Sequence, residues 1–208
     1  MYQVFRKVVG IASENTYVIV NERNEALIVD PGAQAEMLIK WIEDNQWQPQ
    51  AVLLTHGHFD HIGALDAVRQ HFNVEAYIHQ IEADFLVNPV LNLSAGMLNQ
   101  EVRQQPAQHL WNNTGLQKIG AFEFRIELIP GHSPGHVVYI FEQASFVIAG
   151  DTLFNGSIGR TDFYLGSLST LLSGIRTHLM CLTDDFMVYP GHGEATTIGK
   201  ERLSNLYL

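Results

Sequence analysis

The sequence is poor in cysteine and in basic residues, and it has no long apolar run. Cys181 is its only cysteine, so no disulfide can form within the chain, and a reducing, cytoplasmic location is expected. Its 12 Lys and Arg are outnumbered by 22 Asp and Glu; the formal net charge of -10 repels phosphate backbones, so nucleic acid is not expected as a partner. No run approaches the roughly 20 apolar residues that cross a bilayer, and "MYQVFRKVVG" holds no signal-peptide core, so no membrane partner is expected.

The chain has 208 residues, of which 46% are hydrophobic, and this is enough for one domain with a sizeable core. Short β-rich runs alternate with segments that have apolar residues at helical spacing, which predicts an α/β fold. Strands are expected at 16–20, 26–30, 51–55, 76–78, 122–129, 137–141, 145–149 and 186–189. Helices are expected at 35–45, 62–72, 80–87, 168–179 and 198–206.

The segment 88–118 differs from the rest because it shows no clean period and is rich in Asn, Gln and Pro. A long irregular segment inside a compact domain is often a functional lid. We therefore expect a single domain over 1–208 that carries an irregular, lid-like insertion around 88–118.

Four of the predicted strands lead into a residue of a type that binds metals. "AVLLTH" ends at His56, "RIELIPGH" at His132, "FVIAGD" at Asp151 and "FMVYPGH" at His192. In layered α/β folds, ligands collect beyond the carboxyl ends of strands. These side chains are therefore expected to converge on one site.

The stretch "LTHGHFDHIG" (54–63) holds three histidines and an aspartate, residue types that hold a fold together poorly by burial alone. Imidazole nitrogen and carboxylate oxygen are ligands of zinc and similar cations. We expect Gly57 to let the backbone turn, so that the histidines on either side face the same way. Seven candidate ligands result, enough for two ions with positions left for water. They are His56, His58, Asp60, His61, His132, Asp151 and His192.

The other candidates for chemistry are weaker. His71, His79, His109 and His178 stand alone and are interpreted as surface or satisfied core residues. "GHSPG" (131–135) matches the nucleophile elbow of serine hydrolases, but the residue after Ser133 is Pro134, which has no N–H for an oxyanion hole. A strand pattern follows where the elbow needs a helix. Ser133 is therefore interpreted as a turn residue.

The motifs "THGHFDH", "PGHSPGH", "AGDTLF" and "YPGH", in this order, resemble the metallo-β-lactamase superfamily, and within it the glyoxalase II-like hydrolases. The resemblance extends from about Asn15 to Arg202. It implies an α/β fold in a four-layer αββα sandwich and a dinuclear metal site. It assigns His56, His58 and His132 to the first metal, Asp60, His61 and His192 to the second, and Asp151 to a bridge between them.

The resemblance also suggests supporting residues. Asp30 in "DPG" would orient metal-binding histidines, although a turn-capping role is an equal alternative. His136 would lie behind the ligands or on the surface. Arg160 in "GSIGRTDF" would bind a substrate carboxylate, with a structural ion pair to Asp162 as the alternative.

The resemblance implies a zinc-dependent hydrolase, with iron or manganese as other metals. Its substrate would be a small-molecule thioester like S-lactoylglutathione, attacked by a metal-bridged hydroxide, with Asp60 as a catalytic residue. Thioesters suit such a site because the leaving thiol has a pKa of about 8.5 and needs little help from an acid. Asp151 disfavours β-lactam hydrolysis, since the β-lactamases have other residues there.

Other functions remain open from the sequence. The alternative within the superfamily is an iron-dependent persulfide dioxygenase, because "GSIGRTDF" resembles that branch too. A third interpretation is a metal-binding module without turnover. Sixteen residues follow His192, so the C-terminal helical domain with which full glyoxalase II enzymes contact glutathione is not expected. The acyl group, the thiol carrier and the oligomeric state stay open.

Overall fold

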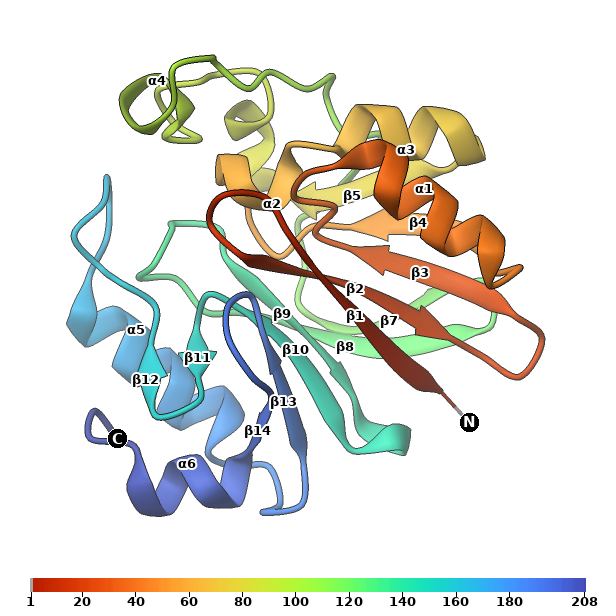
Figure 1. The fold of residues 1–208 in the computed structure, drawn as a ribbon. Coiled ribbons are helices and arrows are strands. Elements are labelled where there is room, and N and C mark those ends of the chain that lie inside the picture. Colours follow the sequence, from red (N-terminus) through yellow and green to blue (C-terminus); the bar gives the residue numbers. More distant parts are fainter. Residues whose placement is uncertain (1) are drawn as a thin grey trace. The chain divides into compact units, whose positions relative to one another are not determined.

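The computed structural model describes residues 2–208 of the chain. They form two compact units, a first unit that ends at Asn112 and a second unit from Asn113 to Leu208. Each unit is built on one six-stranded sheet with helices packed on it (Figure 1). The boundary between the units lies inside the 88–118 segment.

The first unit has the sheet order β1-β2-β3-β4-β5-β6. Its strands are β1 (Gln3–Val9), β2 (Glu14–Val20), β3 (Glu25–Val29), β4 (Gln48–Leu53), β5 (Glu75–His79) and β6 (His109–Trp111). Its helices are α1 (Ala35–Asp44), α2 (Phe59–Ile62), α3 (Leu65–Phe72), the 3₁₀ helix η1 (Gln80–Phe85) and α4 (Ser94–Met97). Strands β3, β4, β5 and β6 run parallel, so their carboxyl ends lie at one edge of the sheet.

The core of the first unit lies between its sheet and helices α1 and α3, which are side by side in Figure 1. Ile28 of β3 and Val52 of β4 pack there with Leu38 of α1 and Leu65 of α3. The alternate strand residues, such as Leu27, are fully buried as well. Both faces of the central strands are thus covered, which explains why these strands are continuous apolar runs.

The second unit has the sheet order β14-β13-β10-β9-β8-β7. Its strands are β7 (Gly115–Ile119), β8 (Phe122–Leu128), β9 (Val137–Phe141), β10 (Phe146–Gly150), β13 (Met187–Pro190) and β14 (Thr196–Thr197), with β11 (Leu153–Phe154) and β12 (Ser157–Ile158) as a separate pair. Its helices are η2 (Glu142–Ala144), α5 (Leu168–Gly174), the π-helical turn η3 (Ile175–Leu179) and α6 (Ile198–Ser204). Leu171, Ile175 and Ile198 from the helices pack with Val147 and Val188 from the sheet.

Two predicted helices are interrupted. The helix expected at 62–72 begins only at Leu65, as α3, because the preceding helix α2 ends at Ile62. Gly63 keeps helical dihedral angles, and a Cβ there would lie 2.3 Å from the carbonyl oxygen of Gly32; the backbone leaves the helical region at Ala64, with φ -104° and ψ 3°. The helix expected at 168–179 changes into η3 after Gly174, and the one expected at 80–87 is the short 3₁₀ helix η1.

The 88–118 segment is more regular than expected, because it contains α4, strand β6 and the first residues of β7. Both strands are at sheet edges and alternate between exposed and half-buried residues, so their apolar signal is weak. The rest of the segment is anchored in part. The Asn92 side-chain amide donates to the carbonyl oxygens of Phe85 and Val102, both at 2.9 Å.

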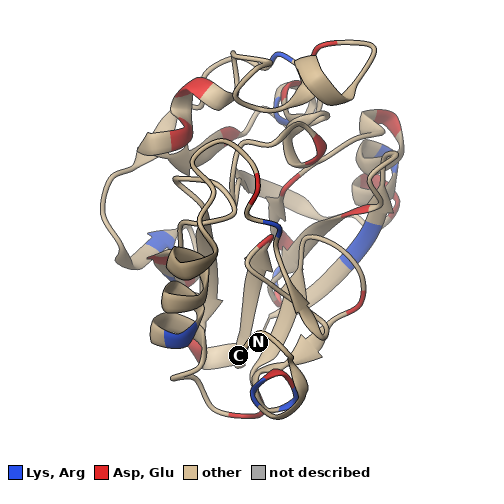
Figure 2. Ribbon diagram, turned by 90° about the vertical axis from the view of Figure 1, so that its left-hand side faces the viewer, with Lys and Arg blue, Asp and Glu red and all other residues tan. Residues whose placement is uncertain are grey.

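The charges follow the expectation of an acidic surface. Figure 2 shows Lys and Arg as isolated positions among the more numerous Asp and Glu, with no basic cluster in the described part of the chain. Within residues 2–208, no helix combines the length and the apolar character needed to cross a membrane.

Candidate metal centre

In the first unit, the candidate ligands follow β4, and the buried Asp30 follows its parallel neighbour β3 at the same edge of the sheet. Asp30 has a φ of 49°, in the left-handed region that aspartate tolerates better than most residues. One of its carboxylate oxygens accepts from the Thr55 N–H at 2.7 Å, and the other accepts from the Thr55 hydroxyl at 2.6 Å. Asp30 therefore ties the ends of the two strands together.

The same carboxylate fixes the tautomer of two histidines. Asp30 Oδ2 lies 3.0 Å from Nδ1 of His61, which must carry the proton to donate to it. The hydroxyl of Thr55 already donates to Asp30, so at 3.1 Å from Nδ1 of His56 it accepts from that ring. Both imidazoles then have their proton on Nδ1 and their lone pair on Nε2, the form that binds a metal.

Gly57 has a different role from the one expected. Its backbone is not in the left-handed region, but a Cβ there would lie 2.4 Å from the Cβ of Phe85. Its N–H donates to the buried carboxylate of Glu82 at 2.5 Å. Glycine is thus needed for close packing against η1, and Glu82 holds the backbone between His56 and His58.

The rings of the cluster lie close together. The centroid of His56 is 4.6 Å from that of His58 and 4.1 Å from that of His61. Asp60 places Oδ2 4.0 Å from Nε2 of His61. Glu14 is buried 3.9 Å from His61 Nδ1, and burial raises the pKa of its carboxyl well above the ordinary value.

The second unit brings its own candidates together at one edge. Strands β8, β10 and β13 point the same way, since β8 and β10 are both antiparallel to β9 and β10 is parallel to β13. His132, Asp151 and His192 follow their carboxyl ends. Oδ2 of Asp151 lies 3.5 Å from Nε2 of His132 and 3.5 Å from Nε2 of His192. One carboxylate oxygen is therefore next to both imidazole nitrogens.

Two further contacts orient these groups. Nδ1 of His132 donates to the carbonyl oxygen of Arg160 at 2.9 Å, which again leaves the lone pair on Nε2. Nε2 of the buried His136 accepts from the Asp151 N–H at 2.9 Å. His136 thus lies behind the candidate ligands and holds the backbone of Asp151.

The side chain of Arg160 forms the ion pair that was the alternative to substrate binding. Its guanidinium donates to both carboxylate oxygens of Asp162, at 2.8 and 2.7 Å, and lies 4.3 Å from the centroid of the Phe163 ring. This pairing lowers the pKa of Asp162 to about 2. The Arg160 side chain is still 56% exposed and can be reached by a ligand.

The isolated histidines have structural partners, as expected. His71 pairs with Glu43, His109 with Glu75 and His178 with Glu127. The ring of the buried His79 accepts from the Ile81 N–H at 3.4 Å, and burial lowers its pKa.

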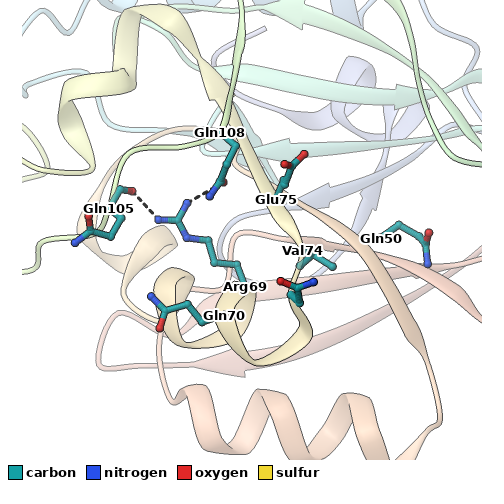
Figure 3. A pocket seen from close by; sticks show the side chains of 8 residues that line it. Gln50, Arg69, Gln70, Val74, Glu75, Gln105 and Gln108 are labelled. Carbon is teal, nitrogen blue, oxygen red and sulfur yellow. Dashed lines mark hydrogen bonds between the residues drawn. The ribbon is translucent and has the colours of Figure 1, made fainter.

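A cavity beside β5 contains none of the candidate ligands. Figure 3 shows the Arg69 guanidinium between Gln105 and Gln108, where it donates to the carbonyl oxygen of Gln105 and the side chain of Gln108, both at 3.0 Å. Arg69 also pairs with Asp66 at 2.6 Å. These contacts anchor residues 105–108 to α3, and we assign the arginine a structural role.

Comparison with known proteins identifies the family. Residues 9–192 match the metallo-β-lactamase superfamily. The chain belongs to this superfamily. The hydroxyacylglutathione hydrolase GloC of Haemophilus influenzae is 39% identical to it over 196 residues, which are 94% of this chain and 92% of that protein. The protein is therefore a metallo-hydrolase of the superfamily.

Two crystal structures confirm the predicted fold class, the metallo-β-lactamase fold. BLEG-1 B3 metallo-beta-lactamase has a TM-score of 0.97 and 42% identity, with 99% of each chain covered. TTHA1623 in a di-iron-bound form has a TM-score of 0.87 and 31% identity, with 98% of this chain and all of that one covered.

The donor set of this superfamily member is compatible with a dinuclear metal centre. Imidazole nitrogens and carboxylate oxygens bind zinc, iron and manganese alike, so the donors do not select one metal. His56, His61 and His132 each have Nδ1 occupied by a hydrogen bond, so that in the neutral form the lone pair is on Nε2. The residues that impose this form, Thr55 and the carbonyl of Arg160, carry no recognisable sequence signal and were missed.

Proposed function

We propose that this metallo-hydrolase cleaves a thioester, with S-lactoylglutathione or a close analogue as substrate. The observation that carries the proposal is the 39% identity to the hydroxyacylglutathione hydrolase GloC over nearly the full length of both chains. The metal ligands that we propose are His56, His58 and His132 for one ion, Asp60, His61 and His192 for the other, and Asp151 for both.

The chain's own residues would prepare the site for this reaction. Bound divalent cations lower the pKa of water towards neutrality and polarise a carbonyl oxygen. Asp30 and Thr55 hold His61 and His56 in the neutral, metal-binding tautomer. Asp60 is the proposed catalytic acid or base, with its carboxylate next to His61. The thiolate that leaves needs no strong acid, because its conjugate acid has a pKa of about 8.5.

The direct test is hydrolysis of S-lactoylglutathione by protein loaded with zinc, iron or manganese, followed through the thiol that is released. We expect turnover that disappears on chelation and returns when metal is added back. A loaded protein that releases no thiol from this or any other thioester would contradict the proposal.

β-Lactam hydrolysis is the second candidate function, and the 42% identity to BLEG-1 B3 metallo-beta-lactamase favours it. The same preparations should be assayed with a penicillin, a cephalosporin and a carbapenem. Thioester cleavage should exceed β-lactam cleavage in kcat/KM, since a thiolate is a better leaving group than an amide nitrogen. Oxygen uptake with glutathione persulfide would instead support the iron-dependent dioxygenase.

The proposed ligands predict a metal content of two ions per chain. Seven ligand-type residues are too many for one tetrahedral zinc, and the 31% identical TTHA1623 has a di-iron-bound form. Elemental analysis of protein that has been saturated with zinc and then freed of excess metal should give close to two per chain. Saturation at one would point to a mononuclear site.

Arg160 is predicted to bind a carboxylate of the substrate. Arg160→Ala should raise KM for S-lactoylglutathione about tenfold with little change in kcat, the result of losing one charged hydrogen bond. Asp162→Ala should lower KM, because it releases the guanidinium from its bidentate pair. The KM for a thioester without carboxylates should be unaffected by both substitutions. An equal effect of Arg160→Ala on both substrates would make it a structural residue.

Within the 88–118 segment, residues 95–101 are the part that we now expect to act as a lid. Apart from the half-buried Leu98 these residues are exposed, whereas Asn92 and Arg69 anchor the chain on either side. Limited proteolysis should cut first within 95–101, and a substrate analogue such as S-hexylglutathione should slow the cut. A first cut elsewhere, unaffected by the analogue, would show that this stretch is no lid.

A further inference from the structure

An apolar cavity of about 340 Å³ lies in the first unit beside Asp60. Its walls include Ile11 and Ala12 from the turn between β1 and β2, Phe59 of α2, and Leu98 and Val102 from the segment after α4. Figure 1 shows the β1–β2 turn next to α2. Segments far apart in the sequence thus form one hydrocarbon-lined space that ends at a proposed metal ligand.

The polar groups of the cavity are few. Asp60 carries the only charge among the described residues that line it. Gln34 lines it too, and its Oε1 accepts from the Gly10 N–H at 3.0 Å. At the mouth, Ile11 is 85% exposed and can contact a ligand. The cavity therefore offers mainly hydrophobic contact.

We propose that this cavity binds the acyl chain of the thioester and that the protein prefers apolar acyl groups larger than lactoyl. The inference rests on the proposed function. Of the two halves of such a substrate, only the acyl half can be apolar. Glutathione carries charges that would lose their hydration in a hydrocarbon-lined space.

The size of the cavity exceeds that of a lactoyl group. At about 30 Å³ for each non-hydrogen atom with its hydrogens, the cavity accommodates roughly eleven such atoms, whereas a lactoyl group has about five. An unfilled apolar space gives up contact energy that a longer chain would recover. Each added methylene should therefore strengthen binding about fourfold until the cavity is full.

The kinetic test uses a series of S-acylglutathiones from acetyl to dodecanoyl, together with S-lactoylglutathione, and the metal-loaded protein. We expect kcat/KM to rise about fourfold per methylene up to about ten carbons, where the acyl group reaches roughly eleven non-hydrogen atoms, and to level off beyond. Ala12→Phe, which narrows the cavity, should reduce the hexanoyl-to-acetyl ratio to near one. Ala67→Phe introduces the same ring at an exposed position of α3 and should leave the ratio unchanged.

A binding test separates this inference from the proposed function. S-methyl- and S-hexylglutathione are thioethers that cannot be hydrolysed, and calorimetry can compare their affinities. We expect the hexyl compound to bind at least 100-fold more tightly, and Ala12→Phe to remove this difference. Thioester turnover with no chain-length effect in either test would overturn the inference alone. Tighter binding of the hexyl compound without cleavage of any thioester would overturn the proposed function and support the cavity as a hydrocarbon-binding site.

Discussion

Asp151→Ala should abolish nearly all hydrolysis and release metal while the fold persists. Its Oδ2 is 3.5 Å from a ring nitrogen of both His132 and His192, so alanine removes a carboxylate that lies next to two proposed ligands. Changing a residue that merely supports a metal ligand costs about 10–100-fold in affinity or activity. For a bridging ligand we expect a loss of more than 100-fold.

The fold should survive because Asp151 follows β10, whose core residues Val147 and Ala149 are untouched. Circular dichroism and the melting temperature of the metal-free protein should therefore resemble those of the parent. Asp44→Ala, which removes an exposed carboxylate paired with Lys40, is the matched control and should retain both metals and full activity. Undiminished turnover by Asp151→Ala with two metals bound would refute the assignment.

Asp30→Ala is predicted to have the second largest effect, on stability as well as on metal binding. It deprives three buried donors of their acceptor, namely the N–H and hydroxyl of Thr55 and Nδ1 of His61. At about 1–3 kcal/mol for each buried group left without a partner, the free energy of unfolding should fall by about 3 kcal/mol or more. Alanine also tolerates the left-handed backbone at this position poorly.

Asp30→Asn distinguishes the two roles that the sequence left open for Asp30, which are orienting the metal-binding histidines and capping a turn. Asparagine caps turns and accepts a left-handed backbone as well as aspartate does, so stability should largely return. It cannot accept hydrogen bonds with both side-chain atoms, however, and loses the charge that keeps the proton on Nδ1 of His61. We expect zinc affinity, measured by competition with a chelator, to stay about 10–100-fold weaker. Parental affinity in Asp30→Asn would show that Asp30 is only a turn cap.

The strands that the sequence shows most directly are those buried on both faces. Strands β2, β3, β9 and β10 and the second half of β4 are dense apolar runs. Strand β1 was missed because most of its residues are exposed or half-buried and the charged Arg6 and Lys7 interrupt its apolar pattern. The break between α2 and α3 was also missed, since at this point the Ala64 N–H donates to the carbonyl oxygen of Pro31, which is distant in the sequence, at 2.9 Å.

The sequence by itself determined the superfamily and the chemical type of the site, because metal ligands are drawn from few residue types and their spacing is strict. Only the tertiary structure decided how those residues are held. Asp30 contacts Thr55 and His61 across 25 and 31 residues, and Glu82 holds Gly57 across 25. His132 is oriented by a backbone carbonyl, which every residue possesses and no side-chain pattern reveals. Hydrogen bonds between distant segments are fixed by how strands and loops pack, and so they have no local signature in the sequence.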